Sequence, residues 1–299
     1  MRKCIFCGRT EEEFVKGNIW TEEHIIPEAL GNETLKIYDV CKECNSGLGT
    51  YVDKYFVNHM LVEIIRQNLG LAGQSARVPN AFKEGKDKDN HLIRVDEQYH
   101  PYPVSYVEQE DEKIRIVAAT VDEAKKIAHK KLARMQFTEE QIVKILENAV
   151  HDSNNDQPEI RYDFTVEFNR FYMEALKIAY EYAIYKIGTN YLKDATAQMI
   201  KDYLYRAIKG EMKEICLDYP NVCMSPQFIK DALQQGSGIN CHMIFLHADA
   251  ENKLIVDIVL FMESAFSFSV CVSEDADRYE IAKDFQVEVI DIIPKRKNF

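Results

Sequence analysis

A chain of 299 residues is long enough to bury a hydrophobic core and to form roughly one to three domains. Hydrophobic side chains make up 46% and charged ones 29%, as in ordinary globular proteins. Because the sequence has no apolar run of about eighteen residues, we expect no membrane span. The net charge of −12 argues against avid binding to bulk nucleic acid unless a basic patch, a bridging cation or a partner supplies positive charge. The N-terminal sequence has no signal-peptide pattern, so we expect a cytoplasmic protein whose eight cysteines are thiols or metal ligands.

Two Cys-x-x-Cys pairs stand near the N-terminus, Cys4 with Cys7 and Cys41 with Cys44. Two residues between thiols allow both sulfurs to bind one tetrahedral ion, with sulfur about 2.3 Å from zinc. A redox pair would need only one Cys-x-x-Cys and a thioredoxin-like strand and helix around it, which the sequence lacks. Two pairs predict a closed, structural Zn²⁺ site, and the alternative is two coincidental pairs of buried cysteines.

The segment between the pairs predicts two strands, and a helix follows them. NIWTEEHIIP, residues 18–27, is rich in β-branched and aromatic residues and ends at a proline, which predicts a strand that stops there. LKIYDVC, residues 35–41, alternates apolar and polar side chains and predicts a second strand. Residues 42–70 follow a helical pattern that glycines 47 and 49 interrupt in its first turns. Zinc would then fasten the two ends of a strand–strand–helix segment.

In order, the segment has Cys-x-x-Cys, Glu23–Pro27 (EHIIP), Leu30-Gly31 and Cys41-x-x-Cys44-Asn45. Over about the first sixty residues it resembles the HNH nuclease family, in the branch that brackets EHIIP with cysteines. Gly49 and Asp53 also suit that branch. The resemblance implies a ββα-metal fold, a DNA substrate and a prokaryotic restriction or antiphage system.

A neutral histidine can take a proton from water at physiological pH, and a divalent ion on oxygen ligands can stabilise a departing phosphodiester oxygen. The resemblance implies that His24 is the general base and that Glu23 and Asn45 hold a catalytic Mg²⁺ or Mn²⁺ ion. Many family members have Asp where Glu23 stands. For the middle Asn of the family pattern, Asn32 and Asp39 are the alternatives.

A second interpretation is a non-catalytic zinc-binding module that recruits a protein partner through the C-terminal part of the chain. In this interpretation His24 is a structural histidine and Glu23 is a surface charge. The acidic net charge of −12 favours it.

The predicted fold class is α+β, with residues 1–69 as the zinc-fastened HNH module, 70–90 as a linker or loop, and 91–299 as an accessory domain. In the last part the sequence predicts strands within 91–119, helices after the capping residues Thr120 and Thr138, and a strand at 160–168. Helices at 169–188 and 195–210 and a three-stranded antiparallel meander at 239–249, 253–262 and 266–273 follow.

His242 and His247 are predicted to be strand-edge residues, while Cys241 and Cys271 lie in apolar runs and are predicted to be core residues. The nuclease chemistry needs only about sixty residues, so we expect the accessory domain to control where or when cleavage occurs. An activating ligand, a protein partner or self-association would supply the trigger.

Overall fold

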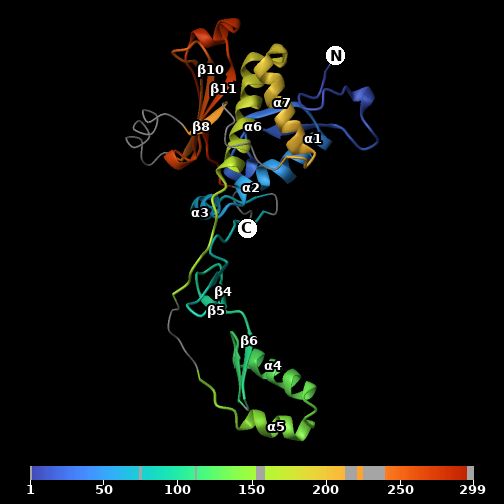
Figure 1. Ribbon diagram of the computed structural model, residues 1–299, viewed down its shortest axis with the longest axis vertical. Helices are drawn as coiled ribbons and strands as arrows, with labels where there is room; N and C mark the ends of the chain where they lie inside the picture. Colours follow the sequence, from blue (N-terminus) through green and yellow to red (C-terminus); the bar gives the residue numbers. More distant parts are fainter. Residues whose placement is uncertain are drawn as a thin grey trace. The chain divides into compact units, whose positions relative to one another are not determined.

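The computed structural model describes residues 2–73, 76–111, 113–152, 159–212, 221–224 and 240–294. They form two compact units, Met1–Pro79 with Val166–Phe299, and Asn80–Thr165 (Figure 1). The protein is of the mixed α+β class with antiparallel sheets. The boundary at Pro79 falls inside the predicted linker, whereas the predicted accessory domain, 91–299, is divided between the units. The physical reason is that residues from Val166 onward share a core with the N-terminal segment.

The N-terminal segment forms an antiparallel hairpin followed by short helices, in the predicted order of strand, strand and helix. Strand β1 pairs with β2, with Trp20 opposite Cys41 and His24 opposite Lys36. A π-helical turn, Gly49–Asp53, separates the first two helices. The bounds are β1 Trp20–His24, β2 Lys36–Cys41, α1 Lys42–Leu48, α2 Lys54–Val57 and α3 Met60–Asn68.

Helix α6, Phe168–Ile187, is the centre of the larger unit and ends at Gly188, as the sequence predicts. Its middle turns are buried on every side, which is typical of a helix enclosed by other elements. The Tyr180 hydroxyl donates to the Ile5 carbonyl at 2.8 Å, and the ring of Tyr172 lies 6.2 Å from that of Phe268. Helix α6 therefore joins the N-terminal segment to the C-terminal sheet in one core.

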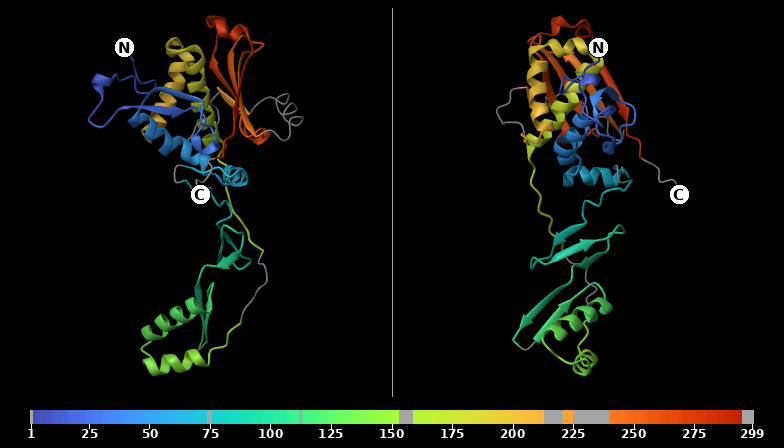
Figure 2. Two further views of the ribbon diagram at one scale, coloured as in Figure 1. Left: turned by 180° about the vertical axis from the view of Figure 1, so that it is seen from behind. Right: turned by 90° about the vertical axis from the view of Figure 1, so that its right-hand side faces the viewer.

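A five-stranded antiparallel sheet in the order β12-β9-β10-β11-β8 forms the C-terminal layer. Helices α6 and α7, Ala195–Ile208, pack against it (Figures 1 and 2). The meander β9-β10-β11 has the predicted strands, and β12 and β8 extend it at its two edges. The strands are β8 Val222–Met224, β9 Cys241–Ala248, β10 Leu254–Val259, β11 Ser267–Ser273 and β12 Gln286–Asp291. Cys241 is buried, and Cys271 is partly buried.

His242 is a core residue, so its predicted place at a strand edge is wrong. Its ring is fully buried; Nδ1 accepts from the Phe261 N–H, and Nε2 therefore donates to the Leu30 carbonyl, each at 3.0 Å. Burial lowers its pKa to about 4, which keeps the imidazole neutral. The sheet is thereby tied to the chain just after EHIIP.

The smaller unit consists of two small antiparallel sheets and two helices. Thr138 forms the predicted capping box with Gln141, and Thr120 accepts from the Glu123 N–H. The predicted strand at 160–168 is wrong: Arg161 makes a single bridge to Lys86, and the other residues find no partner strand among those described. The bounds are β3 Glu84–Lys86, β4 Leu92–Val95, β5 Pro101–Pro103, β6 Tyr106–Glu110, β7 Lys113–Val117, α4 Val121–Arg134 and α5 Glu139–Glu147. None of the described helices is long and apolar enough to cross a membrane.

Candidate metal centre and active site

The four predicted cysteines come together in one cluster. The sulfurs of Cys4, Cys7, Cys41 and Cys44 all lie within 4.8 Å of one another, and those of Cys7 and Cys41 are 3.9 Å apart. Four sulfurs at about 2.3 Å from a tetrahedral zinc would be separated by about 3.8 Å. The cluster can therefore hold a metal ion such as zinc without rearrangement of the backbone.

Both ends of the cluster are shaped by local backbone geometry. Gly8 adopts a φ of +73°, and its N–H donates to the Cys4 carbonyl at 2.8 Å, which closes the first tight turn. Cys41 ends β2 and is the N-cap residue of α1, so Cys44 follows in the first helical turn. The Arg9 guanidinium donates to the Cys7 sulfur at 3.3 Å.

The electrostatics of the cluster favour at least one thiolate even without an ion. A hydrogen bond from Cys44 lowers the pKa of Cys4 to about 5, although burial opposes this shift. The same hydrogen bond, together with burial, raises the pKa of Cys44. A thiolate is the form of cysteine that binds metals, so the cluster is prepared for a cation.

The candidate catalytic residues lie at the junction of β1 with α1. The Asn45 side chain donates its amide hydrogen to the Glu22 carbonyl at 2.7 Å, which holds the first turns of α1 against the strand that carries His24. His24 is half-buried, and burial followed by the positive charge of Lys36 lowers its pKa. Among the described residues none hydrogen-bonds its ring, so a neutral imidazole with a free nitrogen lone pair is present at this strand end.

Glu23 points away from solvent into a buried group of charged side chains. The residue is 5% exposed, and Oε1 of its carboxylate lies 2.9 Å from Nζ of Lys177 on α6. Burial raises the pKa of Glu23 to about 7, and the charge of Lys177 opposes this shift. Glu23 and His24 are consecutive residues of β1, but their side chains have different surroundings.

Five residues make up what we call the buried charge cluster. The Lys177 ammonium donates to the His24 carbonyl at 3.0 Å and lies 3.3 Å from Oδ1 of Asp53. Burial alone would lower the pKa of Lys177, but the surrounding carboxylates outweigh it and raise that pKa. The members of the cluster are Glu23, Asp53, Glu174, Lys177 and Glu181.

A hard divalent ion suits the donors at this junction, because carboxylate and amide oxygens are its preferred protein ligands. Lys177 contacts Oε1 of Glu23, and the carboxylate has a second oxygen. Asn45 uses its amide nitrogen toward Glu22, so its carbonyl oxygen is the atom it can offer. The donor types of Glu23 and Asn45 therefore suit such an ion, with the Glu23 carboxylate directed toward Lys177.

Of the two alternatives for the middle Asn, Asn32 braces the loop between β1 and β2. It is fully buried; its amide nitrogen donates to the Ile26 and Leu35 carbonyls at 2.7 and 2.9 Å, and its oxygen accepts from the Thr34 and Leu35 N–H groups. Asp39 instead pairs with Arg2 at the surface, at 2.6 Å.

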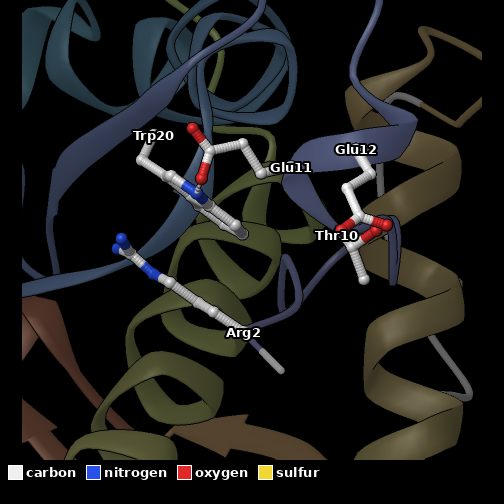
Figure 3. Close-up of a pocket in the computed structure, with 5 residues that line it drawn as sticks. All are labelled: Arg2, Thr10, Glu11, Glu12 and Trp20. Atoms are coloured by element: carbon white, nitrogen blue, oxygen red, sulfur yellow. Dashed lines mark hydrogen bonds between the residues drawn. The ribbon is translucent and has the colours of Figure 1, made fainter.

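A shallow hollow of about 360 Å³ lies beside the start of β1 (Figure 3). The Arg2 guanidinium lies 4.1 Å from the ring centroid of Trp20, whose indole N–H donates to Glu11 at 3.2 Å. Trp20 and His24 are at opposite ends of β1, so this hollow is separate from the candidate catalytic residues.

Sequence reasoning missed Lys177 and its acidic neighbours Glu174 and Glu181. The available signal was their spacing of three and four residues along α6, which places all three on one face, while the other residues of 171–184 are apolar or aromatic. Charged residues at this spacing usually indicate the solvent-exposed face of a helix. Only the three-dimensional structure shows that this face of α6 is buried.

The comparisons with known proteins agree with the N-terminal residues described above. No curated protein and no solved structure matches the chain. Residues 4–61 match the family model described as HNH endonuclease, and this range spans both cysteine pairs, EHIIP and Asn45. Residues 4–61 of the chain are therefore similar to HNH endonucleases.

Proposed function

We propose that the protein is a metal-dependent endonuclease that hydrolyses phosphodiester bonds of DNA, with a structural zinc on the four cysteines. The observation that carries the proposal is the junction of β1 and α1. There, half-buried His24 with a lowered pKa lies one residue from Glu23, and Asn45 is hydrogen-bonded to the same strand. The four-cysteine cluster would fasten the N-terminal turn to the end of β2 and to the first turn of α1.

His24 would take a proton from the attacking water, since its neutral form is favoured by burial. Glu23 and Asn45 would hold a Mg²⁺ or Mn²⁺ ion, which supplies positive charge for the phosphate and for the departing 3′ oxygen. Asn32 would keep the loop after His24 in one conformation through its four hydrogen bonds.

The net charge of −12 supports regulated rather than constitutive cleavage. Each phosphate contact depends on a protein cation that releases counterions, so the free monomer should bind DNA weakly and with strong salt dependence. Activity should rise when a ligand, a protein partner or self-association brings several sites together. A role in prokaryotic restriction or antiphage defence, inside the cytoplasm, would suit such a nuclease.

Replacing the base tests the proposal directly. His24→Ala should lower the rate of plasmid cleavage in Mg²⁺ or Mn²⁺ by about 10²–10⁴-fold, because that is the usual cost of losing a positioned base. Its zinc content should stay near one equivalent, and EDTA should abolish cleavage by the parent. His100→Ala, at an exposed histidine of the smaller unit, is the matched control and should leave the rate unchanged. A His24→Ala protein that cuts like the parent would show that the mechanism is wrong.

The acidic charge also favours the second candidate, a zinc-binding module without catalysis that recruits a protein partner. Plasmid cleavage with and without EDTA separates the two. Metal-dependent cleavage that His24→Ala abolishes excludes the recruitment module as the whole function.

A further inference from the structure

The buried charge cluster contains four carboxylates and a single ammonium. Lys177, Glu174 and Glu181 are at most 1% exposed, and Glu23 is 5% exposed. No oxygen of Glu174 or Glu181 accepts a hydrogen bond from a described residue. The Lys177 ammonium is therefore the one positive group, among the described residues of the cluster, that offsets a negative excess.

Lys177 connects three elements that lie far apart in the sequence. It contacts Glu23 at 2.9 Å and the His24 carbonyl at 3.0 Å, both on β1, and Asp53 at 3.3 Å at the end of the π-helical turn. Residues 24 and 177 are 153 positions apart. The Lys177 ammonium thus contacts the side chain of Glu23 and the backbone of His24, which follows it on β1.

We propose that Lys177 is a positioning residue for the nuclease centre, whose ammonium sets the orientation of the Glu23 carboxylate and of the backbone from which His24 projects. This inference rests on the proposed function. The Lys177 ammonium donates to the His24 carbonyl and forms ion pairs with Glu23 and Asp53, so all three contacts are with the catalytic strand or the turn that follows α1. An apolar side chain of similar length would fill the same volume without these contacts.

Positioning of this kind has a measurable consequence for catalysis. A shift of about 1 Å in a reacting group can cost about 10²-fold in rate. If Lys177 only balanced charge, then removing an equal amount of negative charge would restore function. If it positions Glu23 and His24, charge balance would restore the fold but not the rate.

The experiment compares two variants that differ at Lys177 alone. Glu174→Gln/Glu181→Gln removes two carboxylates and keeps the lysine, while Glu174→Gln/Lys177→Met/Glu181→Gln also removes the ammonium. With all groups ionised, the formal charge of the cluster is −3 in the parent and −2 in the triple variant, so charge imbalance is no greater than in the parent. Lys186→Met, on the same helix, where Lys186 pairs with Glu288, controls for the substitution itself.

We expect both variants to retain one equivalent of zinc and to melt near the parent temperature. The double variant and Lys186→Met should cleave within a few-fold of the parent. The triple variant should cleave about 10²-fold more slowly and bind Mn²⁺ more weakly, as measured by the electron paramagnetic resonance signal of free Mn²⁺. Equal cleavage and equal Mn²⁺ affinity in the double and triple variants would overturn the proposal.

A further variant keeps the test decisive if the triple variant fails to fold. Lys177→Arg in the double-glutamine background retains the charge, but a planar guanidinium cannot reproduce the three contacts of an ammonium. Positioning predicts slow cleavage and weak Mn²⁺ binding by this variant, whereas activity equal to the double variant would overturn it. His24→Ala, measured alongside, separates the two proposals: if it cleaves like the parent, the nuclease function fails whatever Lys177 does.

Discussion

Gly47 and Gly49 are two positions apart, and we expect substitution by alanine to have opposite effects on stability at the two sites. Gly47 lies in α1, where an added Cβ would come within 2.5 Å of the Cγ2 atom of Ile208 and 2.7 Å of its carbonyl oxygen. Gly49 follows α1 with φ −58° and ψ −31°, and a Cβ there would meet nothing within 4 Å. The absence of a side chain at Gly47 is therefore what allows α1 to approach the end of α7.

The free-energy contributions of helix propensity and packing decide whether each alanine substitution stabilises or destabilises the protein. Alanine is favoured over glycine in a helix by about 0.5–1 kcal/mol, so Gly49→Ala should stabilise the protein by that amount. Gly47→Ala gains the same term but overpacks the contact with Ile208, which costs about 1–3 kcal/mol. We expect net destabilisation of about 1–2 kcal/mol, and each kcal/mol shifts the melting temperature by about 2–4 °C in a unit of this size.

Thermal unfolding of the two single variants and the parent tests this reasoning. Combining Gly47→Ala with Ile208→Ala should recover only part of the loss, because the carbonyl oxygen of residue 208 remains in the way. Since α1 also carries Cys44, the Gly47→Ala protein should release zinc to a chelator faster than the parent. A Gly47→Ala protein as stable as Gly49→Ala would refute the close packing of α1 on α7.

Asn32→Ala should destabilise the larger unit by about 3–4 kcal/mol in urea unfolding, because it leaves buried backbone groups without the partners that Asn32 supplies, and unchanged stability would contradict that role. Removal of zinc with a strong chelator should unfold the N-terminal hairpin, visible as lost tryptophan signal from Trp20, the only tryptophan of the chain. Burial alone would raise the pKa of Asp194, but hydrogen bonds from Ser273, Tyr279 and the Thr196 N–H lower it from its usual 3.8. A carboxyl group whose pKa is lower in the folded than in the unfolded protein stabilises the fold at pH values above the unfolded pKa, and this stabilisation is lost as the pH falls. Asp194→Asn should therefore be less stable than the parent at neutral pH, and the difference in stability between the two proteins should disappear below about pH 4. Replacing residues 80–165 by a flexible linker should leave zinc binding and the melting of the larger unit intact, and loss of zinc would argue against two units.

Local patterns were enough to predict the elements that carry the metal cluster. Paired thiol spacing, a proline-ended apolar run and an alternating segment identified β1, β2 and the four cysteines, because each depends on residues close in sequence. The glycine-ended helix α6 and the meander β9-β10-β11 were predictable for the same reason. The prediction of a strand at 160–168 was wrong because alternation of apolar and polar residues does not by itself provide a partner strand.

The remainder depended on contacts between distant parts of the chain. His242 has the local pattern of a strand edge, yet its two ring nitrogens are satisfied by Leu30 and Phe261, which no short-range rule could identify. Lys177 likewise sits in a run whose charges have helical spacing, and its burial follows only from the N-terminal segment and the sheet enclosing α6. Charged residues of this kind can be identified once the helix is known to be buried, because each buried charge then requires a partner of opposite charge.

The placement of α6 bears on where a regulator of the proposed nuclease would act. The Tyr180 hydroxyl donates to the Ile5 carbonyl, Lys177 donates to the His24 carbonyl, and Ile208 closes on Gly47. Residues 166–299 thus share their core with the HNH segment, and a fragment ending near residue 70 would expose that core to water. A ligand that acts through α6 could reach Glu23 and His24 through the contacts of Lys177. The smaller unit, Asn80–Thr165, is compact in itself, and the four cysteines all belong to the larger unit.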